Sequence, residues 1–251
     1  MKKKLLIFLF SLLTVLPTMA SEYVIINGIR YELNPTYKTA KVIMGGYSDN
    51  ITIPAAVTYE GVTYPVTEID NFAFRRKKDL KSVVLPNSLD KIESGLFREC
   101  SGLTRVIIPN SVKVIETGAF MDCTSLTSID IPNSVESIGK NAFLDSGIYN
   151  NSPDGVFYVG KFACGYKGDM PSSITVKEGI EFIAQDAFEK AENLTTVTLP
   201  SSIKSIGKSA FRRCSNLKTI NFPNGLKIID NNAFRDCANL TTITYLTVWK
   251  A

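Results

Sequence analysis

The sequence predicts a mainly β solenoid, a fold in which short coils of the chain stack on one another. The first observation is a 23-residue period. A fourth unit starts at Val135 and breaks off after Asp145. A fixed period of this length is typical of repeat proteins, in which each unit contacts mainly its neighbours. The six complete units cover residues 66–88, 89–111, 112–134, 180–202, 203–225 and 226–248.

The second observation is the apolar pattern inside each unit. Positions 1, 4, 8, 9, 15, 18 and 20 of the period are apolar. In the third unit Leu126, Ile129 and Ile131 follow the alternation of a β-strand, and Pro132 comes next. Proline ends such a strand because it cannot donate a hydrogen bond to a continuing ladder. No unit has ten residues of helical periodicity, so no long helix is expected.

The third observation is that one unit cannot fold alone. Burial of seven apolar side chains does not offset the conformational entropy lost when 23 residues are ordered. Stacked units share their buried faces and add backbone hydrogen bonds, so the units must stack. The phenylalanine at position 9 is then expected to form a continuous column. That column contains Phe74, Phe97, Phe120, Phe143, Phe188, Phe211 and Phe234.

Residues 21–65 lie outside the repeat and predict an N-terminal β-hairpin cap. Apolar and polar residues alternate on both sides of Asn27-Gly28, which is a strong signal for a two-residue hairpin turn. A solenoid needs an end piece that covers the core and the sheet edge of its first coil. Six of the ten tyrosines lie in this segment, so a tyrosine-rich binding face is the alternative. Aromatic residues also suit half-buried strands, which favours the cap.

Residues 66–251 form the predicted solenoid, interrupted by an insertion at 146–172. Two β-rich runs around Gly160-Lys161 predict a hairpin that projects from the solenoid. The insertion is either a binding loop or a structural variant of a repeat.

After Tyr245 only residues 246–251 remain, without a recognisable capping unit or anchor. These residues are expected either to cover the last repeat or to mark a truncated sequence, and an uncovered end would invite pairing with another copy.

Residues 1–20 have the pattern of a secretory signal peptide. Lys2, Lys3 and Lys4 precede a short apolar segment, and Thr18-Met19-Ala20 is a small-x-small cleavage site. Export of a mature chain that starts after residue 20 is therefore expected. No later segment is apolar enough to span a bilayer. Without this segment the chain has 25 basic and 24 acidic side chains, and so near-neutral a protein has no overall field that attracts nucleic acid.

The absence of histidine excludes most catalytic arrangements. Ser-His-Asp and Cys-His pairs, histidine-based zinc sites and the commonest general base all need that residue. Most acidic residues occupy loop positions of the repeat, as Asp122 and Asp236 do, and none is paired by the pattern. The sequence therefore predicts no enzyme, and it indicates no catalytic residue, no cofactor and no metal site.

Four cysteines share position 12 of the repeat, namely Cys100, Cys123, Cys214 and Cys237. Free, stacked, buried thiols are expected there. The alternative is a disulfide between neighbouring repeats, since the spacing of adjacent strands and an export route both permit one.

The basic run at residues 75–78 falls in a turn, and we expect a solvated turn rather than a contact to a polyanion or glycan.

The outward side chains of the predicted sheet form the candidate ligand-binding face. Val84 and Ile107 beside Arg105 make an anchor patch towards the N-terminal end, whereas the later repeats carry mainly Thr, Ser and Asn. Threonine is also simply a favourable residue on an exposed strand. The candidates are Ser82, Val84, Arg105, Ile107, Ser128, Asp130, Thr196, Thr198, Thr219 and Asn221.

The repeat pattern IGxxAFxxCxxLxxVxLPxS closely resembles the BspA-like, or Treponema-type, leucine-rich repeats of bacterial surface and secreted proteins. The resemblance covers about residues 66–146 and 180–248. It implies a curved, right-handed leucine-rich-repeat solenoid with a parallel sheet along one face. It also implies roles in adhesion and protein recognition, and the N-terminal β-cap is a common partner of this repeat type.

These observations together predict an exported binding module without catalysis. We expect it outside the cell or on the surface of a bacterium, with the periplasm as the alternative. Its expected ligand is an extracellular protein or glycan of a host or a neighbouring cell, bound through the sheet face. The alternatives are a carbohydrate-binding accessory protein and a structural surface protein that self-associates through its C-terminal edge.

Overall fold

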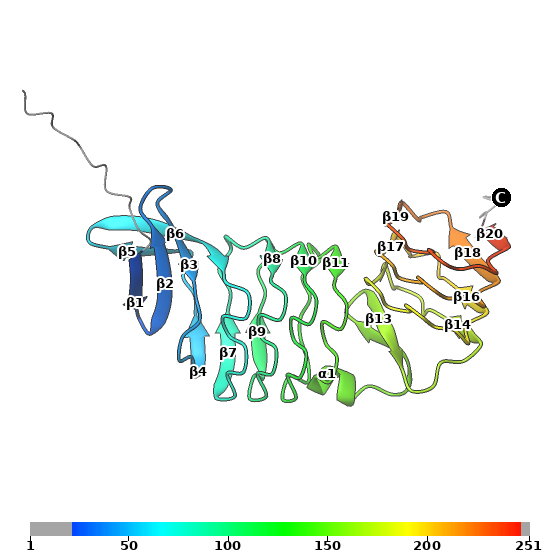
Figure 1. Ribbon diagram of the computed structural model, residues 1–251, viewed down its shortest axis with the longest axis horizontal. Helices are drawn as coiled ribbons and strands as arrows, with labels where there is room; N and C mark the ends of the chain where they lie inside the picture. The colour runs from blue at the N-terminus through cyan, green and yellow to red at the C-terminus, as the bar shows by residue number, and fades with distance from the viewer. Residues whose placement is uncertain (1–21, 247–251) are drawn as a thin grey trace, which may run out of the picture.

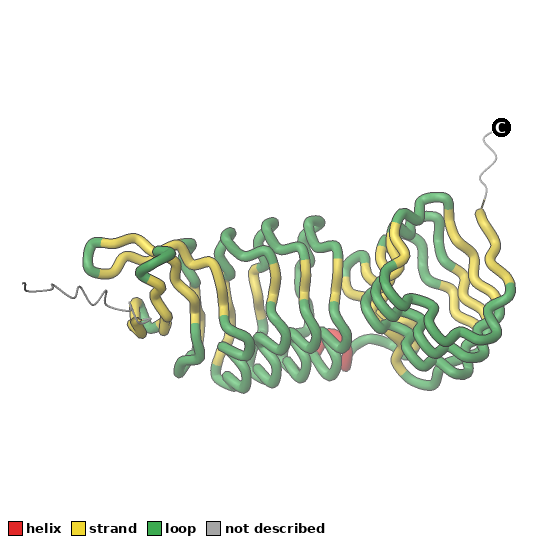
Figure 2. Tube along the Cα trace, turned by 45° about the horizontal axis from the view of Figure 1, so that its top comes forward, coloured by secondary structure: helices red, strands yellow, loops and turns green. Residues whose placement is uncertain are grey.

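The computed structural model describes residues 22–246, so the expected signal peptide lies outside the described residues. The chain forms an elongated solenoid with a β-structure at its N-terminal end (Figure 1). Figure 2 shows narrow coils in two stacks that are joined in the region of the insertion. Strand is the dominant regular structure, and within residues 22–246 the one helix is the short α1 (Gly147–Asn150).

The N-terminal sheet has the strand order β1–β2–β3–β6–β5. Its first two strands form the predicted antiparallel hairpin. The turn residues Asn27 and Gly28 both have the positive φ that such a turn needs. We propose that this sheet caps the first repeat. The strands are β1 (Glu22–Ile26), β2 (Ile29–Asn34), β3 (Thr39–Val42), β5 (Ala56–Tyr59) and β6 (Val62–Ile69).

The repeat period did not predict a shortened coil that precedes the first repeat. β3 pairs in parallel with β6, and β4 (Asp49–Thr52) pairs in parallel with β7 (Leu80–Val84). The chain between β3 and β4 therefore makes one turn in register with the coils that follow. The ring of Tyr47 lies 4.6 Å from that of Phe74, so a tyrosine extends the phenylalanine column.

The coils of the first stack form two parallel ladders, but the third and fourth units contribute a strand only to the first. The first ladder comes from positions 3 and 4 of the repeat, and the second from the leucine-rich run. Between them lie the stacked rings of Phe74, Phe97, Phe120 and Phe143, whose centroids are 5.4, 5.3 and 5.2 Å apart. The first ladder contains β8 (Lys91–Ile92), β10 (Val114–Ile115) and β11 (Ser137–Ile138), and the second contains β4, β7 and β9 (Arg105–Ile107).

The second stack repeats this plan after the insertion. Phe188, Phe211 and Phe234 continue the column with centroid distances of 5.2 and 5.4 Å. One ladder contains β15 (Phe182–Ile183), β17 (Ser205–Ile206) and β19 (Ile228–Ile229). The other contains β14 (Ser173–Thr175), β16 (Thr196–Thr198), β18 (Thr219–Pro223) and β20 (Thr242–Leu246).

The insertion forms the predicted hairpin but does not project from the solenoid. β12 (Gly155–Val159) and β13 (Phe162–Lys167) are antiparallel and turn at Gly160-Lys161. β13 also pairs in parallel with β15, which places it inside the ladder of the second stack. The reason is packing, because Phe162 is buried and its ring lies 4.7 Å from that of Phe182. The hairpin therefore replaces a regular strand of the ladder.

Residues 138–140 of the first stack also contact residues 185–189 of the second stack directly. The Gln185 N–H donates to the Ile138 carbonyl over 3.0 Å. The Lys140 ammonium forms an ion pair with Glu189, whose other carboxylate oxygen lies 3.4 Å from Arg212. Within residues 22–246, no helix is long and apolar enough to cross a membrane.

Candidate binding site

The ladder β4–β7–β9 presents the N-terminal part of the candidate face. Strand alternation turns Val83 and Val106 inwards, where both are buried. Arg105 and Ile107 point outwards and are exposed. Ile107 keeps 41% of its surface in water, which makes it an apolar contact point on an otherwise polar strand.

A cleft of about 710 Å³ opens between β9 and the equivalent segment of the next repeat, residues 127–131. One wall is formed by residues 104–108 and the other by residues 128–132. Asn110 adds a polar group at one end. The volume falls in the range of about 300–1,000 Å³ that is usual for ligand sites.

The cleft exists because the ladder stops at β9. Within the described part of the chain, residues 127–131 form no backbone–backbone hydrogen bond. At the equivalent place in the second stack, the Lys218 N–H donates to the Thr195 carbonyl over 2.8 Å. The inward side chains reflect the lost pairing, since Ile129 and Ile131 are half-buried whereas the equivalent Val197 and Leu199 are buried.

The insertion lies directly beside the unpaired segment. The side chain of Ser146 caps α1, which starts the insertion. The N–H groups of Gly147 and Ile148 donate to the carbonyls of Cys123 and Leu126 over 3.0 and 2.8 Å. The chain that leads into residues 127–131 is therefore bonded to the insertion, which begins where the fourth unit breaks off after Asp145, before its own leucine-rich run.

The two charges in the cleft differ from the charges at the turns. Arg105 and Asp130, on opposite walls, form no ion pair among the described residues. In the basic run at the turn, Arg76 and Arg75 bind Glu99 over 2.8 and 3.0 Å. The hydrogen bonds from Arg76 and then Arg75 hold the pKa of Glu99 below its usual value. The cleft thus offers uncompensated charge of both signs, whereas those two turn arginines are already paired.

The cleft brings together four of the ten residues that the sequence singled out. These four are Arg105, Ile107, Ser128 and Asp130. Ser82 and Val84 lie next to them on β7, where the Ser82 hydroxyl is 2.6 Å from Asn50 Oδ1. The remaining four lie in the other sheet, namely Thr196, Thr198, Thr219 and Asn221.

The expected exposure of Asn221 is wrong. Only 8% of this residue is exposed. Its side-chain oxygen accepts a hydrogen bond from the Leu199 N–H over 2.7 Å, and its amide donates to the Leu199 carbonyl over 2.8 Å. The side chain therefore completes the backbone pairing of β16 with β18, and it is not available to a ligand.

The sequence also missed members of the outward rows. Asn50 and Thr52 pair with Ser82 and Val84 across β4 and β7. On the other sheet, β14 places residues 173 and 175 opposite 196 and 198. The run Ile51-x-Ile53-Pro54 matches Ile129-x-Ile131-Pro132 and could have predicted the strand β4. The search for units at a 23-residue spacing did not identify this run.

The cysteines have a structural role. Each of the four position-12 thiols is free, and each donates to the carbonyl of the phenylalanine one repeat earlier. Cys100 donates to Phe74 over 2.8 Å, and the other three distances are 3.0, 3.1 and 3.0 Å. Burial raises the pKa of Cys100 to about 11, so its thiol stays protonated near neutral pH. Within residues 22–246, no group of His, Cys, Asp or Glu is placed to hold a metal ion.

The stacked coils, their parallel ladders and the leucine at position 15 of each complete repeat define the class of the protein as a leucine-rich-repeat solenoid. The model of the BspA type leucine-rich repeat region matches residues 55–163 and 158–248 with six copies, and the chain belongs to this family. Membership points to a protein-interaction or adhesion module. A search of curated protein sequences finds no match.

Solved structures of bacterial leucine-rich repeat proteins resemble the chain. One from Bacteroides ovatus is 29% identical over 88% of this chain, with a TM-score of 0.51, and the chain spans 52% of that protein. One from Treponema pallidum is 24% identical over 89% of this chain and 82% of its own, with a TM-score of 0.42. One from Bacteroides capillosus is 31% identical over 49% of this chain and 91% of its own, also with a TM-score of 0.42.

Proposed function

We propose that the chain is an exported bacterial module for adhesion or protein recognition, which binds through the face around the β9 cleft and performs no catalysis. The observation that carries this proposal is the cleft itself, where an exposed isoleucine lies between unpaired charges of opposite sign. Interfaces of this kind combine an apolar anchor with charged groups that set orientation and specificity. The ligand is an extracellular protein of a host or a neighbouring cell.

The substitution Ile107→Arg tests this function. An array of purified extracellular proteins and glycans first identifies what the wild-type chain binds. The variant should then lose at least about tenfold in affinity, as expected when an apolar anchor is replaced by a charge. The control is Ile25→Arg on β1, since Ile25 is 72% exposed and lies away from the cleft. Equal affinities for wild type and Ile107→Arg would contradict the proposal.

A carbohydrate-binding accessory role is the second candidate. The sheet of β14, β16, β18 and β20 places Ser173, Thr175 and Thr198 on its exposed side, and hydroxyl groups can bind sugars. Binding to glycans alone on the same array, insensitive to Ile107→Arg, would favour this role.

Self-association is the third candidate. The last coil exposes Ile228, Ile229 and Ile243 by 59, 47 and 44%. In the described range β20 pairs only with β18, so its other edge is free to pair. Size-exclusion chromatography of Ile229→Arg and wild type distinguishes this role, because only an assembly through the last coil would become smaller.

A further inference from the structure

The edge of β9 that faces the cleft has an unused set of backbone groups. β9 is the last strand of its sheet, and its pairing with β7 uses one edge. Residues along a strand point their N–H and C=O groups alternately to the two sides, so those of Val106 face the cleft. Across the cleft, the backbone groups of residues 127–131 are also unpaired within the described part of the chain.

Unpaired strand edges are matched by another strand, because only a polypeptide backbone supplies donors and acceptors at the repeat of a ladder. We propose that the ligand is an extended polypeptide segment that enters the cleft and adds a fourth strand to the sheet β4–β7–β9. This proposal rests on the function proposed above and specifies how the protein ligand is held. The bound strand pairs with β9, and its other edge faces residues 128–130.

The walls of the cleft specify the side chains of that strand. Residues level with one another on neighbouring strands point to the same face. The 23-residue period sets Arg105 level with Ser128 and Ile107 level with Asp130. A bound residue at the first level therefore carries an acidic group for Arg105. A lysine at the second level lays its carbon chain on Ile107 and its ammonium group against Asp130.

The inward side chains of the bound strand are apolar. Between the two levels a bound residue points towards Val106 and Ile129, and the following residue points towards Ile108 and Ile131. The half-buried state of Ile129 and Ile131 shows that this apolar surface is not fully covered. The bound segment thus has the alternating pattern acidic–apolar–basic–apolar in a parallel orientation, or its reverse in an antiparallel one.

The test uses two fluorescein-labelled hexapeptides, Ser-Glu-Val-Lys-Val-Ser and its reverse, with the full chain in fluorescence polarisation. One peptide should bind with a Kd below about 1 mM. Two sets of methylated peptides carry methyl groups on the backbone nitrogens of alternate residues, which keeps every side chain and removes the donors on one edge of the strand. Methylation of the donors that face β9 should weaken binding at least about tenfold. Bound peptide should also slow amide hydrogen exchange at Val106 and in residues 128–130.

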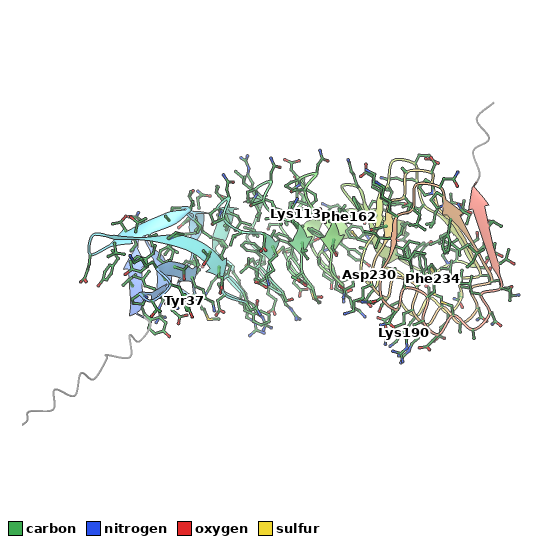
Figure 3. The ribbon with its side chains drawn as sticks, turned by 90° about the horizontal axis from the view of Figure 1, so that it is seen from above. Tyr37, Lys113, Phe162, Lys190, Asp230 and Phe234 are labelled. Carbon is green, nitrogen blue, oxygen red and sulfur yellow. The ribbon has the colours of Figure 1, made fainter. Side chains whose placement is uncertain are left out.

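Charge-swap variants test the side-chain assignment. Arg105→Glu should weaken binding of the peptide at least about tenfold, and a peptide with lysine in place of its glutamate should restore it. The control is Lys190→Glu, an exposed site in the second stack that is labelled in Figure 3. Lys190 has a positive φ of 62°, and Glu99 occupies the equivalent repeat position with a φ of 63°, so glutamate fits there.

Strand addition is overturned if neither peptide binds, or if both sets of methylated peptides bind as tightly as their parents. The two proposals fail separately. A protein ligand that depends on Ile107 but protects no amide of residues 128–130 leaves the proposed function standing and removes strand addition. A chain that captures neither protein nor peptide removes both.

Discussion

At the scale of single residues, the phenylalanine column carries much of the stability. Phe120 is fully buried between Phe97 and Phe143, whose ring centroids lie 5.3 and 5.2 Å away. Phe120→Ala should lower the free energy of unfolding by about 3–5 kcal/mol, because the rigid coils on both sides cannot close the cavity. Urea unfolding followed by circular dichroism measures the loss. Phe234→Ala in the less covered last coil should cost less, and equal losses would contradict the column model.

The buried thiols predict a loss of stability at alkaline pH. Burial raises the pKa of Cys100 to about 11, whereas a cysteine in the unfolded chain ionises near pH ~8.5. Unfolding therefore releases a proton between these values, and stability falls as the pH rises through them, by on the order of 2–3 kcal/mol for this residue. The urea midpoint should decline from pH 8 to 10.5, and the decline should be smaller in Cys100→Ala. A decline of the same size in both would show that this thiol is not its source.

Single residues also show which side-chain positions the sequence can predict and which contacts it cannot. The column and the four thiols follow directly from the period, because equivalent positions of stacked units must superimpose. The burial of Asn221 did not follow from the period, because strand alternation assigns a side to a residue but does not identify its hydrogen-bond partner. Its amide bonds to the backbone of Leu199, and that contact depends on the local register of two strands. The hydrogen bond from the Cys100 thiol to the Phe74 carbonyl could not be predicted from the sequence for the same reason.

At the scale of elements, the ion pair between Lys140 and Glu189 joins coils from the two stacks. The Glu189 carboxylate is 9% exposed, and the hydrogen bond from Lys140 holds its pKa below the usual value. Glu189→Gln should lower the stability at pH 7 by about 1 kcal/mol, a low value because Lys140 itself is half exposed. Since the folded pKa is depressed, this contribution is present above the unfolded pKa of ~4.3 and is lost as the pH falls through the folded pKa.

Thermal melts of wild type and Glu189→Gln from pH 3 to 7 check this sign. The two curves should differ at pH 7 and converge in acid. Lys113→Gln is the control, because its 4.0 Å ion pair with Glu136 is exposed on both sides and should contribute little. A difference that persists unchanged at pH 3 would rule out the carboxylate as its origin.

The elements around the insertion mark the limit of pattern recognition. Gly160-Lys161 between β-rich runs was sufficient to predict a hairpin, as the structure confirms. Its place inside the ladder was not predictable, because a hairpin signal is local whereas the pairing of β13 with β15 joins Phe162 to Phe182, twenty positions along the chain. The cleft was not predictable for the same reason. Residues 127–131 have the same sequence pattern as the equivalent runs in neighbouring repeats, and only the structure shows that they lack a paired strand.

At the scale of the whole molecule, the solenoid has two cores rather than one. The buried apolar side chains form two clusters that meet in β13, where Phe162 belongs to the first and Ala163 to the second. Figure 3 shows Phe162 at the passage between the two stacks. In a repeat protein, stability is close to a sum of unit terms and neighbour terms, so a weakened junction should uncouple the cores.

Phe162→Ala should therefore separate the unfolding of the two stacks. The ring is 2% exposed, and its removal should weaken the junction by about 3–5 kcal/mol. In wild type, hydrogen exchange measured by mass spectrometry along a urea series should give coincident midpoints for residues 91–126 and 194–222. In the variant these midpoints should differ, because each stack then unfolds according to its own stability. Phe120→Ala, which weakens one stack without touching the junction, is the comparison. Midpoints that stay coincident in Phe162→Ala would mean that the coupling passes through Lys140, Glu189 and the Gln185–Ile138 hydrogen bond instead.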